Sequence, residues 1–349
     1  MKKLMIGNQA VAEGLHDGGL GVVSSYPGTP STEITEFLSK FDDIHSEWAP
    51  NEKVACEVAF GSSLAGARSA CAMKHVGLNV AADPLFTLSY TGVNGGLVIC
   101  VADDPAMHSS QNEQDSRHYA MAAKVPMLEP ADSMEAYTFA KNAFELSEKF
   151  DTPVLLRMCT RIAHSQSIVE TGEKVPATLK DYEKNPAKYI MAPANAIKRH
   201  PFVEERTLAL QEFAENCEYN TVEMNSDEIG IITSGCSYQY VKEVMGDSAS
   251  VLKIGMSYPL PVKLIKDFAS KVKTLYVIEE LDPFIENHVK ALGIPVIGKE
   301  KFSILGEFSQ ATIAKAFGKE LPECVSADSP IPNRPPMMCA GCPHRGLFY

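Results

Sequence analysis

The chain is organised around residues 51–66, which read N-E-K-V-A-C-E-V-A-F-G-S-S-L-A-G. Asn51 is a good N-cap, and Glu52 falls in the first turn, where a carboxylate interacts favourably with the positive helix end. Most of the following residues are small and spread around the helix, which predicts a deeply buried helix. Burial would raise the pKa of the Glu52 carboxyl, as a proton relay requires. A solvated first-turn acid is the alternative interpretation.

Strands and helices are expected to alternate on both sides of this helix. Continuous apolar runs of strand length are typical of a parallel sheet that helices cover on both faces. Residues 96–102 form such a run, and further strands are expected at 21–25, 44–48, 69–76 and 153–159. Helices are expected at residues 8–15, from residue 29 onward, and at 132–150. The alternation predicts an α/β fold with a doubly wound, mainly parallel sheet.

A second, smaller α/β unit is predicted beyond a charged, proline-dotted crossover. The crossover spans residues 166–227, is expected to lack strands, and is partly helical around 204–217. The expected strands are at residues 228–233, 250–255, 274–279 and 294–297, and the expected helices at 238–244, 261–272, 283–292 and 308–317. The predicted boundaries are therefore 1–165, 166–227 and 228–325, followed by a proline-rich linker at 326–349.

Four acidic residues gather at the end of one strand in this second unit. They are Glu279, Glu280, Asp282 and Glu286. A metal site is one interpretation of this group. Acids at a strand end and on a helix face are more often solvated, so we favour that interpretation.

Composition excludes several classes of function. The 349 residues carry a formal net charge of −12, which argues against an extended nucleic-acid surface. No apolar stretch approaches a membrane span, and the apolar run at the N-terminus is too short for a signal peptide. Nine cysteines without a disulfide-type spacing indicate a reduced, cytoplasmic protein. We expect small molecules and other proteins as partners.

Two polar segments are candidates for ligand binding. The first is Y-P-G-T-P-S at residues 26–31, where Thr29 is expected to cap a helix with Pro30 at its first position. Its hydroxyl and N–H groups would make an anion site, although taken alone this segment is more simply interpreted as an ordinary strand-to-helix corner. The second is the aperiodic stretch at 103–120, which we expect to form a loop over the carboxyl ends of the strands.

Five motifs in order carry a resemblance to a known family. They are Y-P-G-T-P-S at 26–31, N-E-K-V-A-C-E-V-A-F-G at 51–61, S-S-Q-N-E-Q-D-S-R at 109–117, A-N-A-I-K-R-H-P-F-V-E-E-R at 194–206 and C-A-G-C-P-H-R-G at 339–346. Together they resemble the large (alpha) subunit of indolepyruvate:ferredoxin oxidoreductases, over essentially the whole chain. The resemblance implies a thiamine diphosphate pyrimidine-binding domain, then a transketolase C-terminal-like domain. Because members of this family continue further, it also implies a diphosphate-binding domain that is absent here.

The resemblance also implies roles for individual residues. Glu52 matches the glutamate that contacts N1′ of thiamine diphosphate and thereby activates the cofactor. Thr29 matches a residue that positions the 2-oxoacid carboxylate, with Ser31 beside it. Tyr26 and Pro27 belong to the same turn and are expected beside the cofactor.

The segment from Ser109 to Arg117, including Asn112, is expected to line the substrate pocket. Asp103 and Asp104 lie near the place where pyruvate-oxidising relatives carry an arginine that clasps the substrate carboxylate. This departure fits a different, larger aromatic substrate.

Cys339 and Cys342 resemble the C-x-x-C pair with which relatives hold an iron–sulfur cluster. Two thiolates are half of the ligands of one cluster, and no other cysteines are placed to complete the set. A thioredoxin-like redox pair or half of a zinc knuckle remain alternatives.

The resemblance therefore implies a thiamine diphosphate- and Mg²⁺-dependent enzyme that oxidatively decarboxylates arylpyruvates to aryl-acetyl-CoA. Coenzyme A would be the co-substrate, and 4Fe–4S clusters would pass electrons to ferredoxin. A beta subunit would complete an oligomeric, cytoplasmic enzyme. One alternative is a related enzyme for branched-chain 2-oxoacids. Another is a noncatalytic assembly subunit, since the chain has no diphosphate- or magnesium-binding motif of its own.

Overall fold

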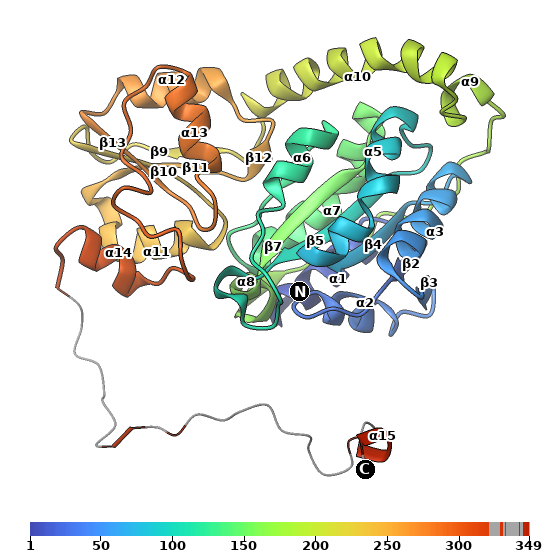
Figure 1. The fold of residues 1–349 in the computed structure, drawn as a ribbon, viewed down its shortest axis with the longest axis horizontal. Coiled ribbons are helices and arrows are strands. Elements are labelled where there is room, and N and C mark those ends of the chain that lie inside the picture. The colour runs from blue at the N-terminus through green and yellow to red at the C-terminus, as the bar shows by residue number, and fades with distance from the viewer. Residues whose placement is uncertain (321–328, 331, 333–341, 343–344, 349) are drawn as a thin grey trace.

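The computed structural model describes residues 1–320, 329–330, 332, 342 and 345–348. Two α/β units lie next to each other, and a long helix runs along the top edge of the molecule between them (Figure 1). The first unit is built on a seven-stranded sheet of order β12-β6-β7-β5-β4-β2-β3. All neighbouring strands in it are parallel except β12 and β6. The predicted α/β fold with a mainly parallel sheet is confirmed.

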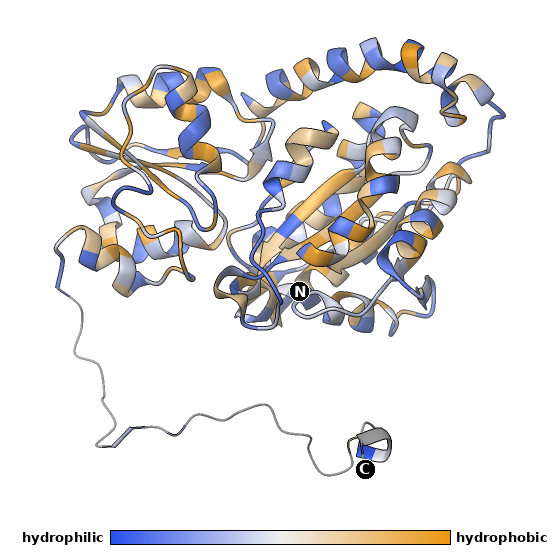
Figure 2. Cartoon of the chain, viewed as in Figure 1, coloured by the Kyte–Doolittle hydropathy of each residue, from blue (hydrophilic) through white to orange (hydrophobic). Residues whose placement is uncertain are grey.

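The central strands of this sheet are continuous apolar runs, as predicted, and they are the orange core of the first unit in Figure 2. The strands of this sheet from the first part of the chain are β2 (Val22–Ser25), β3 (His45–Trp48), β4 (Ser69–Lys74), β5 (Leu97–Asp103), β6 (Met127–Leu128) and β7 (Val154–Cys159). Every residue of β4, β5 and β7 is buried. Burial of both faces explains why these strands show no alternation.

Helices cover both faces of the sheet. One face carries α1 (Gly7–Asp17), α2 (Thr32–Leu38), α7 (Ser133–Phe150) and α8 (Thr160–His164). The other carries α3 (Glu52–Leu64), α4 (His75–Val80), α5 (Ala82–Thr91) and α6 (Arg117–Ala123). The unit is therefore a three-layer sandwich with one apolar core on each side of the sheet.

Helix α3 is less buried than its composition predicted. Its inner side, Ala55, Cys56, Ala59 and Ser63, packs against the sheet, whereas Glu57, Gly61 and Ala65 are exposed. The prediction of a deeply buried helix is therefore wrong for the part of the chain that the structure describes. Small residues permit close approach on every side, but the sheet, α4 and α5 leave the side of Glu57, Gly61 and Ala65 uncovered.

The expected crossover contains strands, contrary to the prediction. β8 (Gln166–Glu170) pairs antiparallel with β1 (Lys2–Ile6) in a separate ribbon beside α8, and β9 (Thr221–Glu223) joins the second sheet. Neither strand has an apolar run that marks it, because each lies at an edge and has one partner.

Two helices occupy the middle of the crossover, α9 (Pro186–Tyr189) and the 22-residue α10 (Pro193–Ala214). Polar contacts attach them to the first unit. Lys188 and Arg199 pair with Asp151 at 2.8 and 3.0 Å, and Arg206 donates to the Asp151 carbonyl at 2.9 Å. Arg206 is buried, which lowers the pKa of its guanidinium to about 10. The crossover is therefore a packed strap over the α5 side of the sheet.

The second unit has a four-stranded sheet of order β13-β10-β11-β9. Its elements are β10 (Ile229–Ser234), α11 (Gly235–Met245), β11 (Ser250–Ile254), α12 (Val262–Ser270), β13 (Thr274–Ile278), α13 (Phe284–Ala291) and α14 (Gln310–Ala316). Apolar clusters lie on both faces of this sheet. The strand predicted at 294–297 is wrong, because only Ile297 forms a bridge, to Tyr276. Two 3₁₀ turns, Pro105–Met107 and Gly246–Ser248, and a short C-terminal helix α15 (Arg345–Phe348) complete the described elements.

The second unit also lends a strand to the first. β12 (Met256–Tyr258) pairs antiparallel with β6, and the backbone N–H of Glu129 donates to the Gly255 carbonyl at 2.7 Å. This pairing was not predicted, because three residues carry no periodic signal. It places the carboxyl ends of β7 and β10 next to each other across the boundary between the units.

Candidate functional site

The sheet of the first unit has one topological switch point. From β2 the chain moves outward to β3, then crosses back to β4 on the other side of β2. As a result α2 and α3 pack on opposite faces of the sheet, and the carboxyl ends of β2 and β4 mark the switch point. Open α/β sheets bind their ligands outside the carboxyl ends of the strands at such a point.

Glu52 lies at this edge of the sheet, at the start of α3. The side chain of Asn51 caps the helix by accepting from the Val54 N–H at 3.0 Å, which fixes where Glu52 begins the first turn. Gly77 of α4 faces Glu52, and a Cβ at Gly77 would lie 2.7 Å from the Glu52 Cγ and Oε1 atoms. The glycine therefore leaves the space that the Glu52 carboxyl occupies. Glu52 is partly exposed, with α4 on one side of its carboxyl group.

The turn at residues 26–31 follows β2 at the same edge. The helix after it begins at Thr32, so the prediction that Thr29 caps the helix is wrong. Ser31 is buried and its hydroxyl donates to the Gly28 carbonyl at 2.9 Å, while the Thr32 hydroxyl accepts from the Gly28 N–H at 2.9 Å. These two hydroxyls close the turn on itself. The Thr29 side chain is exposed at this edge.

Tyr26 and Pro27, the first residues of this turn, are also exposed at the carboxyl edge of the sheet. Ser25, just before them, is the anchor of the turn. Its hydroxyl oxygen accepts from Thr35 at 2.7 Å and from the Ala72 N–H of β4 at 3.0 Å. The turn is thus fixed to both α2 and β4.

Two residues that the sequence analysis did not single out, Lys74 and His75, join this turn to the polar loop. The aliphatic part of Lys74 lies beneath Gly28, where an added Cβ would be 3.3 Å from its Cγ and Cδ atoms. Its Nζ donates to the Ser109 carbonyl at 2.7 Å. Both residues are buried. The signal that could have revealed them is a polar pair at the end of an otherwise apolar strand.

His75 also leaves one ring nitrogen without a partner. Its Nε2 lies 3.1 Å from the backbone and side-chain oxygens of Asn112, so Nε2 carries the proton and Nδ1 is an acceptor. Nδ1 is buried and has no hydrogen-bond partner in the described part of the chain. Ser109 and Asn112 are therefore brought to the switch point as expected of a loop over the strand ends.

Arg117 lies elsewhere. It is buried at the boundary between the two units, where it pairs with Asp115 and with Glu279, both at 2.5 Å. It also donates to the Glu280 carbonyl at 3.0 Å. Burial opposes ionisation of Asp115, but Arg117 and Arg157 outweigh it and hold the pKa of Asp115 well below its usual range. Arg117 therefore joins the two units, and its donors do not face the switch point.

The acids that were expected to be solvated are mostly buried. Glu279, Glu280 and Glu286 expose 2%, 8% and 3% of their surfaces. Glu279 accepts from the N–H groups of Ile285 and Glu286 at the start of α13, both at 3.0 Å. Burial nevertheless raises the pKa of Glu279 above its usual value, against the influence of Arg117. The interpretation of these acids as solvated side chains is wrong, because partners from distant segments, such as Arg117 for Glu279, cover them.

Of the predicted cysteine pair, Cys339 lies outside the described residues. Cys342 is described and partly exposed. Within the described residues no helix is long and apolar enough to cross a membrane.

The sequence model of the pyruvate flavodoxin/ferredoxin oxidoreductase, thiamine diphosphate-binding family matches residues 13–230. These residues include the whole switch point. The chain belongs to this family. The resemblance inferred from the five motifs is confirmed.

Relatives in several archaea share the full length of this chain. Indolepyruvate oxidoreductase subunit IorA of Archaeoglobus fulgidus is 42% identical over 376 residues, which cover 100% of this chain and 60% of the relative. The subunits of the same name from Pyrococcus horikoshii and Methanothermobacter marburgensis are 39% and 40% identical and are covered to 59% each. The chain thus spans about 60% of the length of these relatives.

Two solved structures share the fold. A 2-oxoglutarate:ferredoxin oxidoreductase from Magnetococcus marinus matches with a TM-score of 0.75 at 18% identity, over 91% of this chain and 65% of that chain. A split-gene transketolase matches with a TM-score of 0.56 at 15% identity, over 90% of this chain and 98% of that chain. Both likenesses concern the fold alone.

Proposed function

We propose that this chain is the pyrimidine-binding part of a thiamine diphosphate-dependent 2-oxoacid:ferredoxin oxidoreductase that acts on arylpyruvates such as indolepyruvate. The observation that carries the proposal is the placement of Glu52 on the first turn of α3, against Gly77, at the switch point of the sheet. The names of the full-length relatives support indolepyruvate as the substrate. In this proposal residues 1–165 form the pyrimidine-binding domain and residues 228–325 the transketolase C-terminal-like domain.

The residues at the switch point fit the aminopyrimidine of thiamine diphosphate. Gly77 leaves room beside the Glu52 carboxyl, and the buried Nδ1 of His75 is an unpaired acceptor close by in the chain. When bound, thiamine diphosphate supplies the carbon nucleophile that attacks the 2-oxoacid. Glu52 would share a proton with the ring nitrogen of the pyrimidine. Tyr26 and Pro27, exposed at the same edge of the sheet, would lie beside the cofactor.

The substrate lies between the turn and the polar loop in this proposal. Thr29 offers an exposed hydroxyl from the turn, and Ser109 and Asn112 approach from the loop. Lys74 supplies a buried cation between them, and a cation there attracts the carboxylate of a 2-oxoacid. Ser31 acts indirectly, since its hydroxyl holds the turn closed.

Other components would complete the reaction. We propose that Mg²⁺ and the diphosphate of the cofactor are held by a further domain or chain, that coenzyme A accepts the acyl group, and that a beta subunit and 4Fe–4S clusters deliver electrons to ferredoxin. Cys339 and Cys342 are proposed as ligands of one such cluster. In support, the 2-oxoglutarate:ferredoxin oxidoreductase of similar fold was solved with coenzyme A bound.

A Glu52→Gln variant of the full enzyme tests the proposal. The amide keeps the size of the side chain but cannot share an acidic proton, so we expect indolepyruvate-dependent reduction of a viologen dye to fall by about 10²–10⁴-fold. Thermal unfolding of the variant should match that of the parent. Near-normal turnover in a folded variant would remove Glu52 from the mechanism. Comparing indolepyruvate with 2-oxoisovalerate and 2-oxoglutarate tests the substrate class separately.

A noncatalytic assembly subunit is the second candidate. One solved structure of similar fold is described as an inactive tetramer of a split-gene transketolase subunit. Titration of the isolated chain with thiamine diphosphate and Mg²⁺ distinguishes the catalytic role from the assembly role. If the role is catalytic, we expect little cofactor binding by the chain alone and tight binding once its partner is added. If the partner binds the cofactor equally well without this chain, the assembly role is favoured.

A further inference from the structure

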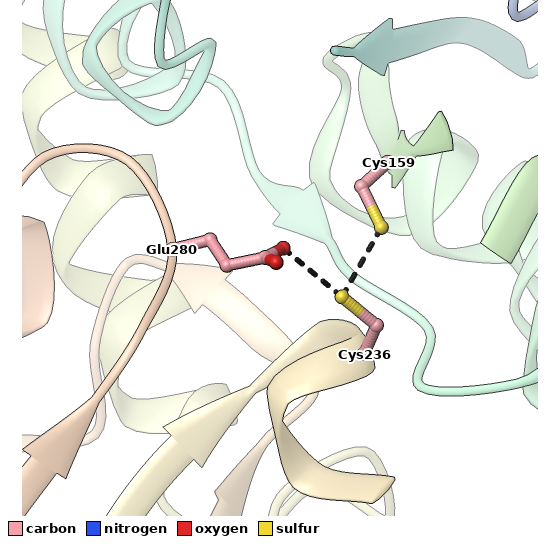
Figure 3. Close-up of side chains that lie close together, drawn as sticks. All are labelled: Cys159, Cys236 and Glu280. Carbon is pink, nitrogen blue, oxygen red and sulfur yellow. Dashed lines mark hydrogen bonds between the residues drawn. The ribbon is translucent and has the colours of Figure 1, made fainter. Parts of the chain in front are cut away.

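We propose that Cys159, Cys236 and Glu280 form a buried site for a transition-metal ion, with Zn²⁺ as the best fit, at the boundary between the two units. Cys159 ends β7 of the first unit, Cys236 lies in the first turn of α11 in the second, and Glu280 follows β13. All three are buried. Figure 3 shows the Cys236 sulfur between the Cys159 sulfur and the Glu280 carboxylate. The site is separate from the switch point and does not depend on the proposed function.

The donor atoms are already close to a coordinating arrangement. The Cys236 Sγ lies 3.3 Å from the Cys159 Sγ and 3.0 Å from Glu280 Oε2, and the three donor atoms lie within 4.8 Å of one another. Tetrahedral zinc with Zn–S bonds of about 2.3 Å separates two sulfur ligands by about 3.8 Å. The sulfurs therefore need to move apart by only about half an ångström to accept the ion. Two thiolates with a carboxylate are a ligand type that zinc accepts.

Another carboxylate lines the same cavity, outside the group of three donor atoms. The cavity has a volume of about 10 Å³, room for one species of the size of a water molecule, and Glu129 is among its lining residues. Glu129 Oε1 accepts from Arg157 at 2.5 Å and from Ser234 at 3.2 Å. Its other oxygen, Oε2, is buried and has no hydrogen-bond partner among the described residues. A buried carboxylate oxygen without a partner is costly, and positive charge in the cavity reduces that cost.

The charges around the cavity favour a cation over free thiolates. Four buried carboxylates, from Asp103, Asp115, Glu129 and Glu279, pair with two buried guanidinium groups, from Arg117 and Arg157, and the buried Glu280 carboxylate lines the same cavity. Two thiolates alone would add negative charge to this excess. A divalent ion enters as the two thiols release their protons to solvent, so the net charge of the cluster is unchanged.

The ligands come from both units, so the metal would hold the units together. This inference predicts one equivalent of zinc per chain in the full enzyme purified without chelators, in addition to any iron. Cys159→Ser and Cys236→Ser should each lose that equivalent. Cys217→Ser is the matched control, because Cys217 is also buried but lies outside the cavity and should keep the zinc.

If a serine variant fails to fold, the inference can still be tested by cobalt titration. The titration uses the unsubstituted enzyme after its zinc has been removed. Co²⁺ should produce thiolate-to-metal charge-transfer bands, and a Glu280→Gln variant, which retains both cysteines, should bind Co²⁺ at least tenfold more weakly. Two results would overturn the inference. One is zinc content that does not differ between the cysteine variants and the control. The other is a Cys159–Cys236 disulfide in peptide mapping of the purified enzyme, with no bound metal.

Discussion

A Gly77→Ala substitution tests whether α4 positions the Glu52 carboxyl. The added Cβ would lie 2.7 Å from both Cγ and Oε1 of Glu52, whereas ordinary van der Waals contact begins near 3.4 Å. The carboxyl group must therefore move by about 0.7 Å or adopt another rotamer, because it is the flexible partner in this clash. Gly77 lies inside α4, so the alanine itself suits the backbone.

The substitution should lower the activity of the enzyme without lowering its stability. A misplacement of about 1 Å at a reacting group can lower the rate by about 10²-fold, so we expect kcat to fall by about 10- to 100-fold. Helix propensity favours alanine over glycine by about 1 kcal/mol, so the free energy of unfolding should stay the same or rise slightly. A mutation that merely disturbed packing would lower both.

The assay is indolepyruvate-dependent dye reduction by the full enzyme, together with thermal unfolding. Gly21→Ala is the control, because a Cβ at Gly21 meets its neighbours at 3.6 Å or more, which is ordinary contact. We expect the control to keep full activity. If Gly77→Ala also keeps full activity with unchanged stability, Glu52 is not positioned by its contact with α4. The assignment of the catalytic site to the switch point then loses its main support.

Two further predictions concern the boundary between the units. Arg117→Met should lower the free energy of unfolding by about 3–5 kcal/mol, measured by urea denaturation, because it leaves Asp115 and Glu279 buried without their cation; Lys53→Met, which removes an exposed ion pair, should change it little. Stability should also depend on Asp115 in acid. Its pKa is depressed in the folded state, so its stabilising contribution is complete above the ordinary value of 3.8 and declines as pH falls toward the folded value. The unfolding free energy of Asp115→Asn should therefore fall less steeply below about pH 4 than that of the parent, and equal slopes would contradict the role of the ion pair.

Strands with strong local patterns were predictable from sequence. β5 and β7 are continuous apolar runs because helices cover both faces of the sheet, and that burial is visible in the residues themselves. β6 and β12, of two and three residues, were missed because they exist only through pairing with each other and with β7. Such short strands have no period that a sequence can display.

Some features of the candidate site were likewise predictable from sequence and others were not. The position of Glu52 at the start of α3 was predictable, because an N-cap, a first-turn acid and a run of small residues are all local in sequence. Lys74 and His75 were not singled out, because their importance depends on the turn and the loop that fold over the end of β4. Arg117 ends the loop motif, yet its guanidinium pairs with the carboxylate of Glu279, 162 positions further along the chain, and donates to the Glu280 carbonyl. It also pairs with its neighbour Asp115.

The sequence by itself determined the α/β class, the family and the glutamate at the head of α3, since helix caps, apolar runs and motif order all act between near neighbours in the chain. Only the tertiary structure decided that Glu279 and Glu280 are buried, that Arg117 joins the two units, and that Cys159 meets Cys236. The physical reason is that charge burial and coordination depend on which distant segments meet. In this protein the pairing of β12 with β6 brings those segments together.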